Sequence, residues 1–164
     1  MKIGLVGLGR MGAGITERLR RAGHQVVGYD RDPALRDVDS LASLVAALEP
    51  QRVLWLMVPA GDPTQAVIDD LAALVAPSDI LVDGGNSYYK DSVRRAAALA
   101  AQGVHFIDAG TSGGIWGLRE GFCIMAGGPR PAFDTIEPML AALAPPGGYA
   151  LRNEFGGHPV RESP

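Results

Sequence analysis

Short apolar runs alternate with longer amphipathic segments along most of the chain. Apolar residues fill consecutive positions in the short runs, as in strands buried on both faces, and recur at helical spacing in the longer segments. The predicted strands are 3–6, 25–29, 53–58, 80–83, 104–108 and 122–126, and the predicted helices are 11–22, 41–48, 63–76, 88–101 and 131–143. This alternation predicts an α/β fold with a doubly wound, mostly parallel sheet and right-handed crossovers, a Rossmann-like architecture.

The first predicted strand runs directly into a glycine turn, Gly7-Leu8-Gly9-Arg10-Met11-Gly12, which opens the first helix. In a dinucleotide-binding turn, Gly7 permits the tight bend, Gly9 lets the backbone approach a pyrophosphate, and Gly12 lets the helix pack close to the strand. The N–H groups that begin the helix then face the phosphates. Glycine turns of this kind also occur without a ligand, so the motif depends on its context. That context is favourable, because the next strand ends at Asp30, about 20 residues beyond the turn, where an acid accepts hydrogen bonds from the adenosine ribose.

Asp30 also bears on the choice of cofactor. A carboxylate at this position repels a 2′-phosphate and favours NAD over NADP. Arg31 follows it and offers a guanidinium that could pair with such a phosphate, or else remain solvated or stack on adenine. We expect NAD, with NADP as the open alternative.

Four predicted loops follow the carboxyl ends of strands, where open α/β sheets bind ligands. These loops are 7–12, 58–61, 84–87 and 110–114, and three of them are rich in glycine. Asn86 offers a donor and an acceptor, and Ser112 offers a hydroxyl beside flexible amides. Both are candidates for ligand contacts, and helix capping or turn formation is the alternative role.

Polar residues at the predicted helix starts indicate caps at Ser40, Asp62 and Ser87. The connection 31–39 holds a proline and three aspartates and is predicted to lack a helix, unlike the usual doubly wound fold.

Composition excludes several classes of protein. The 164 residues are 47% hydrophobic and 20% charged, with a net charge of −3 and no basic run, so neither nucleic acid nor a membrane is an expected partner. No apolar stretch approaches a membrane span, and no signal or transit pattern opens the chain, so we expect a cytoplasmic protein. The lone Cys123 excludes an internal disulfide and is predicted to be a buried structural thiol. No Cys/His cluster has the spacing of metal ligands.

Oxidation of an alcohol by hydride transfer requires a general base near the hydroxyl. The predicted strand ends carry no histidine, lysine or cysteine placed for this role. Lys90 falls in the first turn of a helix and His105 within a strand, so we expect the first to be solvated and the second to be packed.

Four stretches together resemble the 6-phosphogluconate dehydrogenase family, in its shorter bacterial branch that often uses NAD. They are the turn 7–12, Trp55-Leu56-Met57-Val58-Pro59-Ala60-Gly61, Val82-Asp83-Gly84-Gly85-Asn86-Ser87-Tyr88-Tyr89-Lys90-Asp91 and Gly110-Thr111-Ser112-Gly113-Gly114-Ile115-Trp116-Gly117-Leu118. The resemblance runs from Met1 to about Tyr149. It implies NAD(P)-dependent oxidation of 6-phosphogluconate at C3, with loss of CO₂, to ribulose 5-phosphate in the pentose phosphate pathway.

The resemblance also implies site residues, position by position. The cofactor would contact Gly7, Gly9, Arg10, Met11, Gly12, Asp30, Arg31, Met57, Val58 and Asn86. The substrate, a phosphorylated sugar acid, would contact Asn86, Ser112, Gly113 and Gly114.

Two features depart from the family pattern. One is the short connection 31–39. The other is that residues 1–148 resemble the cofactor domain, while 149–164 resemble the family's C-terminal tail, in which an arginine and a histidine placed as Arg152 and His158 reach the substrate of a neighbouring subunit. A disordered end is the alternative reading of this tail.

The helical domain that carries the family's base lysine and acid glutamate has no counterpart here, so no catalytic residue is assigned. We expect weak or no turnover, and a monomer or non-native self-association where relatives form homo-oligomers. The alternatives are a catalytically incomplete NAD(P)-binding module and the cofactor domain of another β-hydroxyacid dehydrogenase.

Overall fold

The computed structural model describes residues 1–148, which form one twisted sheet between two layers of helices. The strands are β1 (Lys2–Val6), β2 (Gln25–Tyr29), β3 (Val53–Leu56), β4 (Ile80–Asp83), β5 (His105–Ser112) and β6 (Cys123–Gly127). The helices are α1 (Arg10–Arg21), α2 (Leu41–Ala46), α3 (Asp62–Ala72), α4 (Tyr89–Ala100), the 3-10 turn Gly114–Trp116, α5 (Gly117–Glu120) and α6 (Arg130–Leu143). The strand order is β2-β1-β3-β4-β5-β6, in which β6 alone runs antiparallel. The predicted Rossmann-like α/β class is therefore correct.

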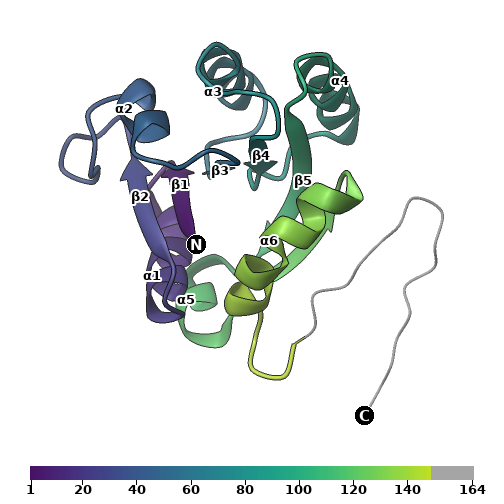
Figure 1. Ribbon diagram of the computed structural model, residues 1–164. Helices are drawn as coiled ribbons and strands as arrows, with labels where there is room; N and C mark the ends of the chain where they lie inside the picture. The colour runs from purple at the N-terminus through teal and green to yellow at the C-terminus, as the bar shows by residue number, and fades with distance from the viewer. Residues whose placement is uncertain (149–164) are drawn as a thin grey trace.

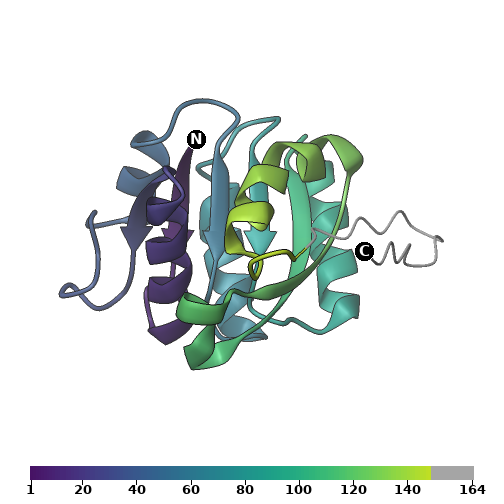
Figure 2. The same cartoon turned by 90° about the horizontal axis from the view of Figure 1, so that it is seen from below.

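Both faces of the sheet are buried, which explains the unbroken apolar runs in its strands. Figure 1 shows α2, α3 and α4 on one face and α1, α5 and α6 on the other. In β3, Trp55 belongs to the core layer under α1 and α6, whereas Leu54 and Leu56 belong to the layer under α3. Figure 2 shows α1 beside α6 on the same face of the sheet, and the two helices are in contact.

The connection between β2 and α2 holds no regular element, as predicted. The Asp37 carboxylate fastens it to the edge strand, because Oδ2 accepts from the Gly28 N–H at 2.8 Å and from Arg20 Nη2 at 2.9 Å. The hydrogen bonds of one carboxylate thus anchor this irregular connection to β2 and α1.

Two of the three predicted caps are wrong. Ser40 does cap α2, where its Oγ accepts from the Ser43 N–H at 3.0 Å. Helix α3 instead has Gly61 as its N-cap, with φ +88°, and Asp62 is already helical. Ser87 turns inward and donates to Asp83, so Tyr88 precedes α4 without a side-chain cap.

Strand β5 continues through Gly110 and Thr111 to Ser112, a stretch expected to be a loop. The antiparallel pairing with β6, from Asp108–Gly127 to Ser112–Cys123, extends the strand. Cys123 is exposed rather than buried, because β6 is the last strand of the sheet. The 3-10 turn and α5, which join β5 to β6, were not predicted.

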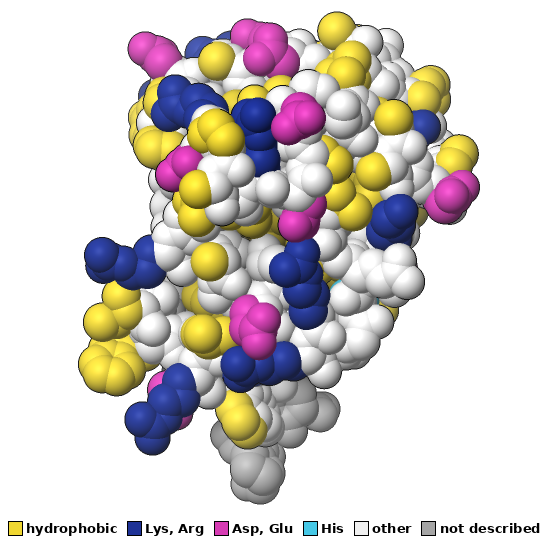
Figure 3. Space-filling view, turned by 90° about the vertical axis from the view of Figure 1, so that its left-hand side faces the viewer, with side chains coloured by type: hydrophobic (Ala, Val, Ile, Leu, Met, Phe, Trp, Pro, Cys, Tyr) yellow, Lys and Arg dark blue, Asp and Glu magenta, His cyan; other side chains and the backbone are white. Residues whose placement is uncertain are grey.

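The surface is mixed in charge. Figure 3 views the molecule from the side of β2 and α1, and basic and acidic side chains intermingle on that face. Among residues 1–148, no helix has the length and apolarity needed to cross a bilayer, and no group of three His, Cys, Asp or Glu side chains is placed to hold a metal.

Candidate functional site

The direction in which the chain adds strands to the sheet reverses at β1. From this strand the chain first adds β2 on one side and then crosses to add β3 on the other. Such a switch point leaves a crevice outside the carboxyl ends of the two diverging strands. The turn 7–12 after β1 and the turn 57–61 after β3 border this crevice.

The glycine turn has the geometry that a dinucleotide requires. Gly7 has φ +92°, and its N–H donates to Tyr29 O at 2.8 Å. A Cβ at Gly7 would collide with Met57 O, and one at Gly12 would collide with Gly7 O. At Gly9, by contrast, a Cβ would meet nothing within 4 Å. Two glycines therefore serve packing, and the third leaves open space at the start of α1.

That open space lies at a helix N-terminus. Gly9 is the N-cap residue of α1 and has no side chain to occupy the first N–H groups. These groups and the helix dipole favour an anion such as a pyrophosphate. Arg10 is exposed beside them, while Met11 is half-buried and packs against the core.

Asp30 closes the turn from the β2 side. Its Oδ2 accepts from the Leu8 N–H at 2.6 Å, and its Oδ1 accepts from the Asp32 N–H at 2.8 Å. A carboxylate has about four acceptor sites, so capacity remains for ribose hydroxyls. The contact with Leu8 confirms that Asp30 lies against the glycine turn, while Arg31 is exposed.

Met57 and Val58 lie across the crevice from Asp30. Met57 N–H donates to Val6 O at 2.7 Å, so the turn after β3 is tied to the end of β1. Both side chains are half-buried, and Met57 Sδ accepts from Trp55 Nε1 at 3.2 Å. Trp55 is consequently a fluorescent reporter on this side of the crevice.

Asn86 adopts a left-handed backbone conformation. Its φ is +57°, which non-glycine residues seldom adopt. Its Nδ2 donates to Thr111 O at 2.9 Å, and its Oδ1 accepts from Thr111 N–H at 2.8 Å. Neither capping nor simple turn formation describes this role, because the amide joins the turn after β4 to strand β5.

A buried ion pair that sequence reasoning missed lies beneath this turn. Arg95 Nη1 is 3.1 Å from Asp83 Oδ2, and the two side chains are 1% and 0% exposed. The signal was present in the sequence, since an arginine falls on the apolar face of a predicted helix and an aspartate ends an apolar strand.

A pocket of about 380 Å³ opens beside Asn86, between the turn after β4 and the β5–β6 pair. Its lining includes Ser87, Asp108, Gly110 and Met125. Burial raises the pKa of the Asp108 carboxyl, and the nearby Asp83 acts in the same direction, while the Ser92 hydroxyl and Arg95 oppose them. Asp108 is thus a titratable group beside a predicted ligand residue.

The glycines predicted to contact substrate follow the end of β5. Ser112 is the exposed last residue of that strand. Gly113 and Gly114 have φ values of +139° and +50°, in the left-handed region that favours glycine. The other predicted substrate residues, Arg152 and His158, lie outside the described residues.

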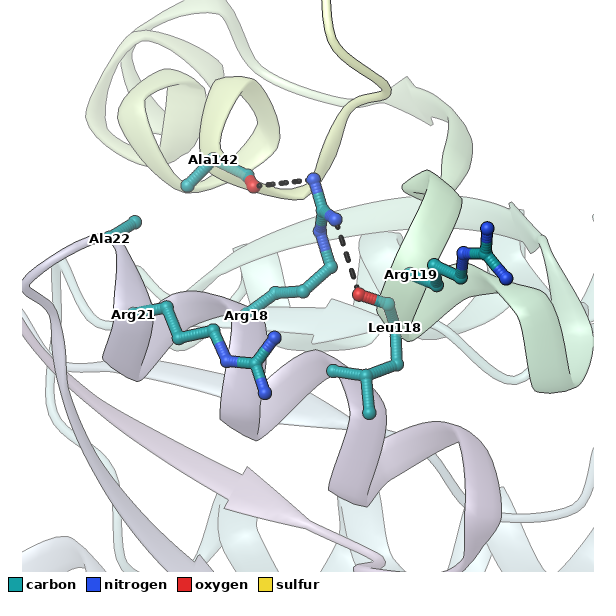
Figure 4. A pocket seen from close by; sticks show the side chains of 6 residues that line it. All are labelled: Arg18, Arg21, Ala22, Leu118, Arg119 and Ala142. Carbon is teal, nitrogen blue, oxygen red and sulfur yellow. Dashed lines mark hydrogen bonds between the residues drawn. The ribbon is translucent and has the colours of Figure 1, made fainter.

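A second pocket, of about 550 Å³, lies between α1, α5 and α6 (Figure 4). Arg18 crosses it, donating from Nη2 to Ala144 O at 2.8 Å and from Nη1 to Leu118 O at 3.3 Å. Arg21 and Arg119 flank the opening. Arg18 satisfies carbonyl groups at two helix ends, so its role is to hold the three helices together.

Comparison with known proteins gives consistent results. Residues 2–151 match the family model described as the NAD binding domain of 6-phosphogluconate dehydrogenase. The chain is 42% identical over 172 residues to the NAD+-dependent, decarboxylating 6-phosphogluconate dehydrogenase of Haloferax volcanii, covering 98% of this chain and 56% of that protein. The chain thus spans about half the length of the first curated relatives it matches.

Two solved structures are similar in fold. The Plasmodium falciparum 6-phosphogluconate dehydrogenase superposes with a TM-score of 0.82 at 26% identity, over 90% of this chain and 35% of that one. The Mycobacterium tuberculosis 3-hydroxyisobutyrate dehydrogenase superposes with a TM-score of 0.79 at 27% identity, over 87% of this chain and 52% of that one. By its sequence match and by the geometry of its glycine turn, the chain belongs to the NAD-binding domain family of 6-phosphogluconate dehydrogenase.

Proposed function

We propose that this chain binds NAD at the switch-point crevice and forms the cofactor half of a decarboxylating 6-phosphogluconate dehydrogenase. The observation that carries the proposal is the contact between the Asp30 carboxylate and the Leu8 N–H, which lies within a glycine turn whose middle residue leaves open space. An acid in this position accepts hydrogen bonds from the ribose of NAD.

The residues present fit the cofactor. The start of α1 at Gly9 would hold the pyrophosphate, Asp30 the adenosine ribose, and the turns that carry Met57, Val58 and Asn86 the nicotinamide half. When bound, NAD supplies the hydride acceptor. The carboxylate of Asp30 opposes a 2′-phosphate, which supports NAD over NADP as the preferred form.

For the substrate we propose 6-phosphogluconate, which the H. volcanii relative is named for at 42% identity. Asn86, Ser112, Gly113 and Gly114 would supply its contacts. They lie at the carboxyl ends of β4 and β5, beside the turns proposed for the nicotinamide.

Among the described residues, no lysine or histidine lines the pocket beside Asn86, where the titratable side chain is the carboxyl of Asp108. Lys90 is exposed on α4, 6.0 Å from the ring centres of Tyr88 and Tyr89. His105 begins β5 and pairs with Ile80, at the opposite end of the sheet. We therefore propose that these 164 residues bind cofactor but turn over 6-phosphogluconate weakly or not at all.

The test is a titration of the chain with NADH, followed by Trp55 fluorescence, and then addition of NAD+ with 6-phosphogluconate. We expect saturable binding and no rise in reduced-cofactor absorbance. Absence of binding by a folded sample would refute the cofactor proposal. Turnover close to that of full-length relatives would refute the proposed weak or absent turnover.

The second candidate is a cofactor domain for another β-hydroxyacid, which the likeness to 3-hydroxyisobutyrate dehydrogenase supports. Equilibrium dialysis against each acid in the presence of NADH separates the two. Retention of 6-phosphogluconate favours the first proposal, whereas retention of 3-hydroxyisobutyrate favours the second.

A further inference from the structure

Asp83 and Arg95 form an ion pair that is closed off from solvent, with side chains 0% and 1% exposed. Removing two charges from water costs about as much as their attraction returns, and apolar side chains of the same size often give equal stability. Stability alone therefore does not explain why this pair stands at the end of β4.

The contacts of Arg95 reach two separate turns at the carboxyl edge of the sheet. Its Nη2 donates to Gly61 O at 3.1 Å, in the turn after β3. Its Nη1 donates to Ser87 Oγ at 2.9 Å, in the turn after β4, and its Nε donates to Gln65 Oε1 at 2.9 Å, on α3. Because the guanidinium is planar and rigid, these contacts set the spacing of the two turns.

Asp83 completes the connection from below. Its Oδ1 accepts from Gly85 N–H at 2.9 Å, and its Oδ2 accepts from Ser87 Oγ at 2.7 Å. The turns are already close, since a Cβ at Gly85 would lie 2.6 Å from Val58 O. The segment that presents Asn86 is thus held between the ion pair and Thr111 of β5.

The two turns lie on one side of the switch point, and Asp30 lies on the other. In doubly wound folds each side binds one mononucleotide half of the cofactor. We infer that Arg95, through Asp83, is a positioning residue that holds the turns after β3 and β4 at the separation required by the nicotinamide ring of the dinucleotide. This inference rests on the proposed binding of NAD.

The test compares NADH with ADP-ribose, which keeps the adenosine, the pyrophosphate and the second ribose but lacks the nicotinamide ring. Arg95→Met keeps most of the side-chain volume and removes every donor. Isothermal titration calorimetry on the full chain is expected to show NADH binding weakened at least about tenfold, the scale of one charged hydrogen bond. The affinity for ADP-ribose is expected to stay within about twofold, since Arg95 does not contact that side.

A matched control lies at the other end of the same strand. Arg52 Nη1 is 3.1 Å from Asp79 Oδ2, and those side chains are 20% and 1% exposed. Arg52→Met breaks this pair at the amino end of β4, away from the crevice. Both ligands are expected to bind this variant with unchanged affinity, whatever its melting temperature.

Arg95→Lys serves if Arg95→Met does not fold. An ammonium retains the charge opposite Asp83 but cannot reach Gly61, Gln65 and Ser87 together. The affinity for NADH should therefore fall, and the affinity for ADP-ribose should not. An equal loss of affinity for both ligands, or an unchanged affinity for NADH in a folded variant, would overturn the inference. Failure of the wild-type chain to bind ADP-ribose and NADH would instead refute the dinucleotide proposal on which it depends.

Discussion

Replacing Asp30 by alanine separates the two roles that the structure gives this side chain. The carboxylate accepts hydrogen bonds from the backbone N–H groups of Leu8 and Asp32 at 2.6 and 2.8 Å. Hydrogen bonds to a charged group contribute about 1.5–3 kcal/mol each when buried. Because Asp30 is half-exposed, water replaces part of this, and we expect a loss of about 1–3 kcal/mol in the free energy of unfolding.

The effect on binding has the opposite sign for the two cofactors. NADH loses a charged acceptor for its ribose hydroxyls, which corresponds to about 10- to 150-fold in affinity. NADPH loses a repulsive charge beside its 2′-phosphate, and the neighbouring Arg31 becomes free of a competing anion. Asp30→Ala is therefore expected to lower the affinity for NADH and to raise the affinity for NADPH.

Fluorescence titration with both cofactors, at one ionic strength, measures the ratio of the two dissociation constants. Asp32→Ala is the matched control, because it removes the same charge from the same connection. Its carboxylate accepts from Ala34 N–H at 2.9 Å and makes no contact with the glycine turn. If Asp32→Ala shifts the ratio as much as Asp30→Ala does, long-range charge rather than ribose recognition explains the selectivity, and the reasoning above is wrong.

Three further predictions concern stability and the site. Gly9→Ala is expected to keep the wild-type melting temperature and to lose NADH affinity in calorimetry, because its methyl group enters the open space proposed for the pyrophosphate. Gly12→Ala should lose NADH affinity and also about 1–3 kcal/mol of stability, because its methyl group collides with Gly7 O. Equal melting temperatures for the two variants would contradict this prediction. Arg18→Met should lower the free energy of unfolding, measured by urea denaturation, by about 1–3 kcal/mol through lost bonds to Leu118 and Ala144. NADH affinity should stay unchanged, and a loss of affinity would be the contrary result. Burial raises the pKa of Asp108, so the folded state binds more protons, and the free energy of unfolding falls as pH rises from the unfolded-state pKa to the folded-state pKa. Asp108→Asn should remove that fall when unfolding is measured as a function of pH. An unchanged pH profile of stability would count against this prediction.

The geometry of the glycine turn and the position of Asp30 beside it were predictable, because their signals are local or follow a fixed spacing. Gly7, Gly9 and Gly12 stand within one turn, and each occupies the steric role expected of it. Ser40 was likewise predictable as a cap, since its partner is only three residues away.

Predictions failed where the surroundings of a residue in the folded sheet differed from those that its short sequence context indicated. Ser87 has the spacing of a cap, yet its hydroxyl donates to Asp83 Oδ2 and accepts from Arg95 Nη1, so it faces the buried ion pair rather than the start of α4. Cys123 occupies an apolar run but is exposed, because nothing in the run indicates that β6 is the last strand of the sheet.

The sequence by itself determined the α/β class, the order of the elements and the place of the cofactor turn, because periodicity and glycine sterics act within a few residues. Only the tertiary structure decided that Arg95 joins Gly61 to Ser87 and that Asn86 is bound to Thr111. These partners are 8 to 34 residues apart, and strand order brings them together at one edge of the sheet. A pairing of this kind depends on which strands lie side by side, and that choice comes from the packing of the whole core rather than from any short pattern in the chain.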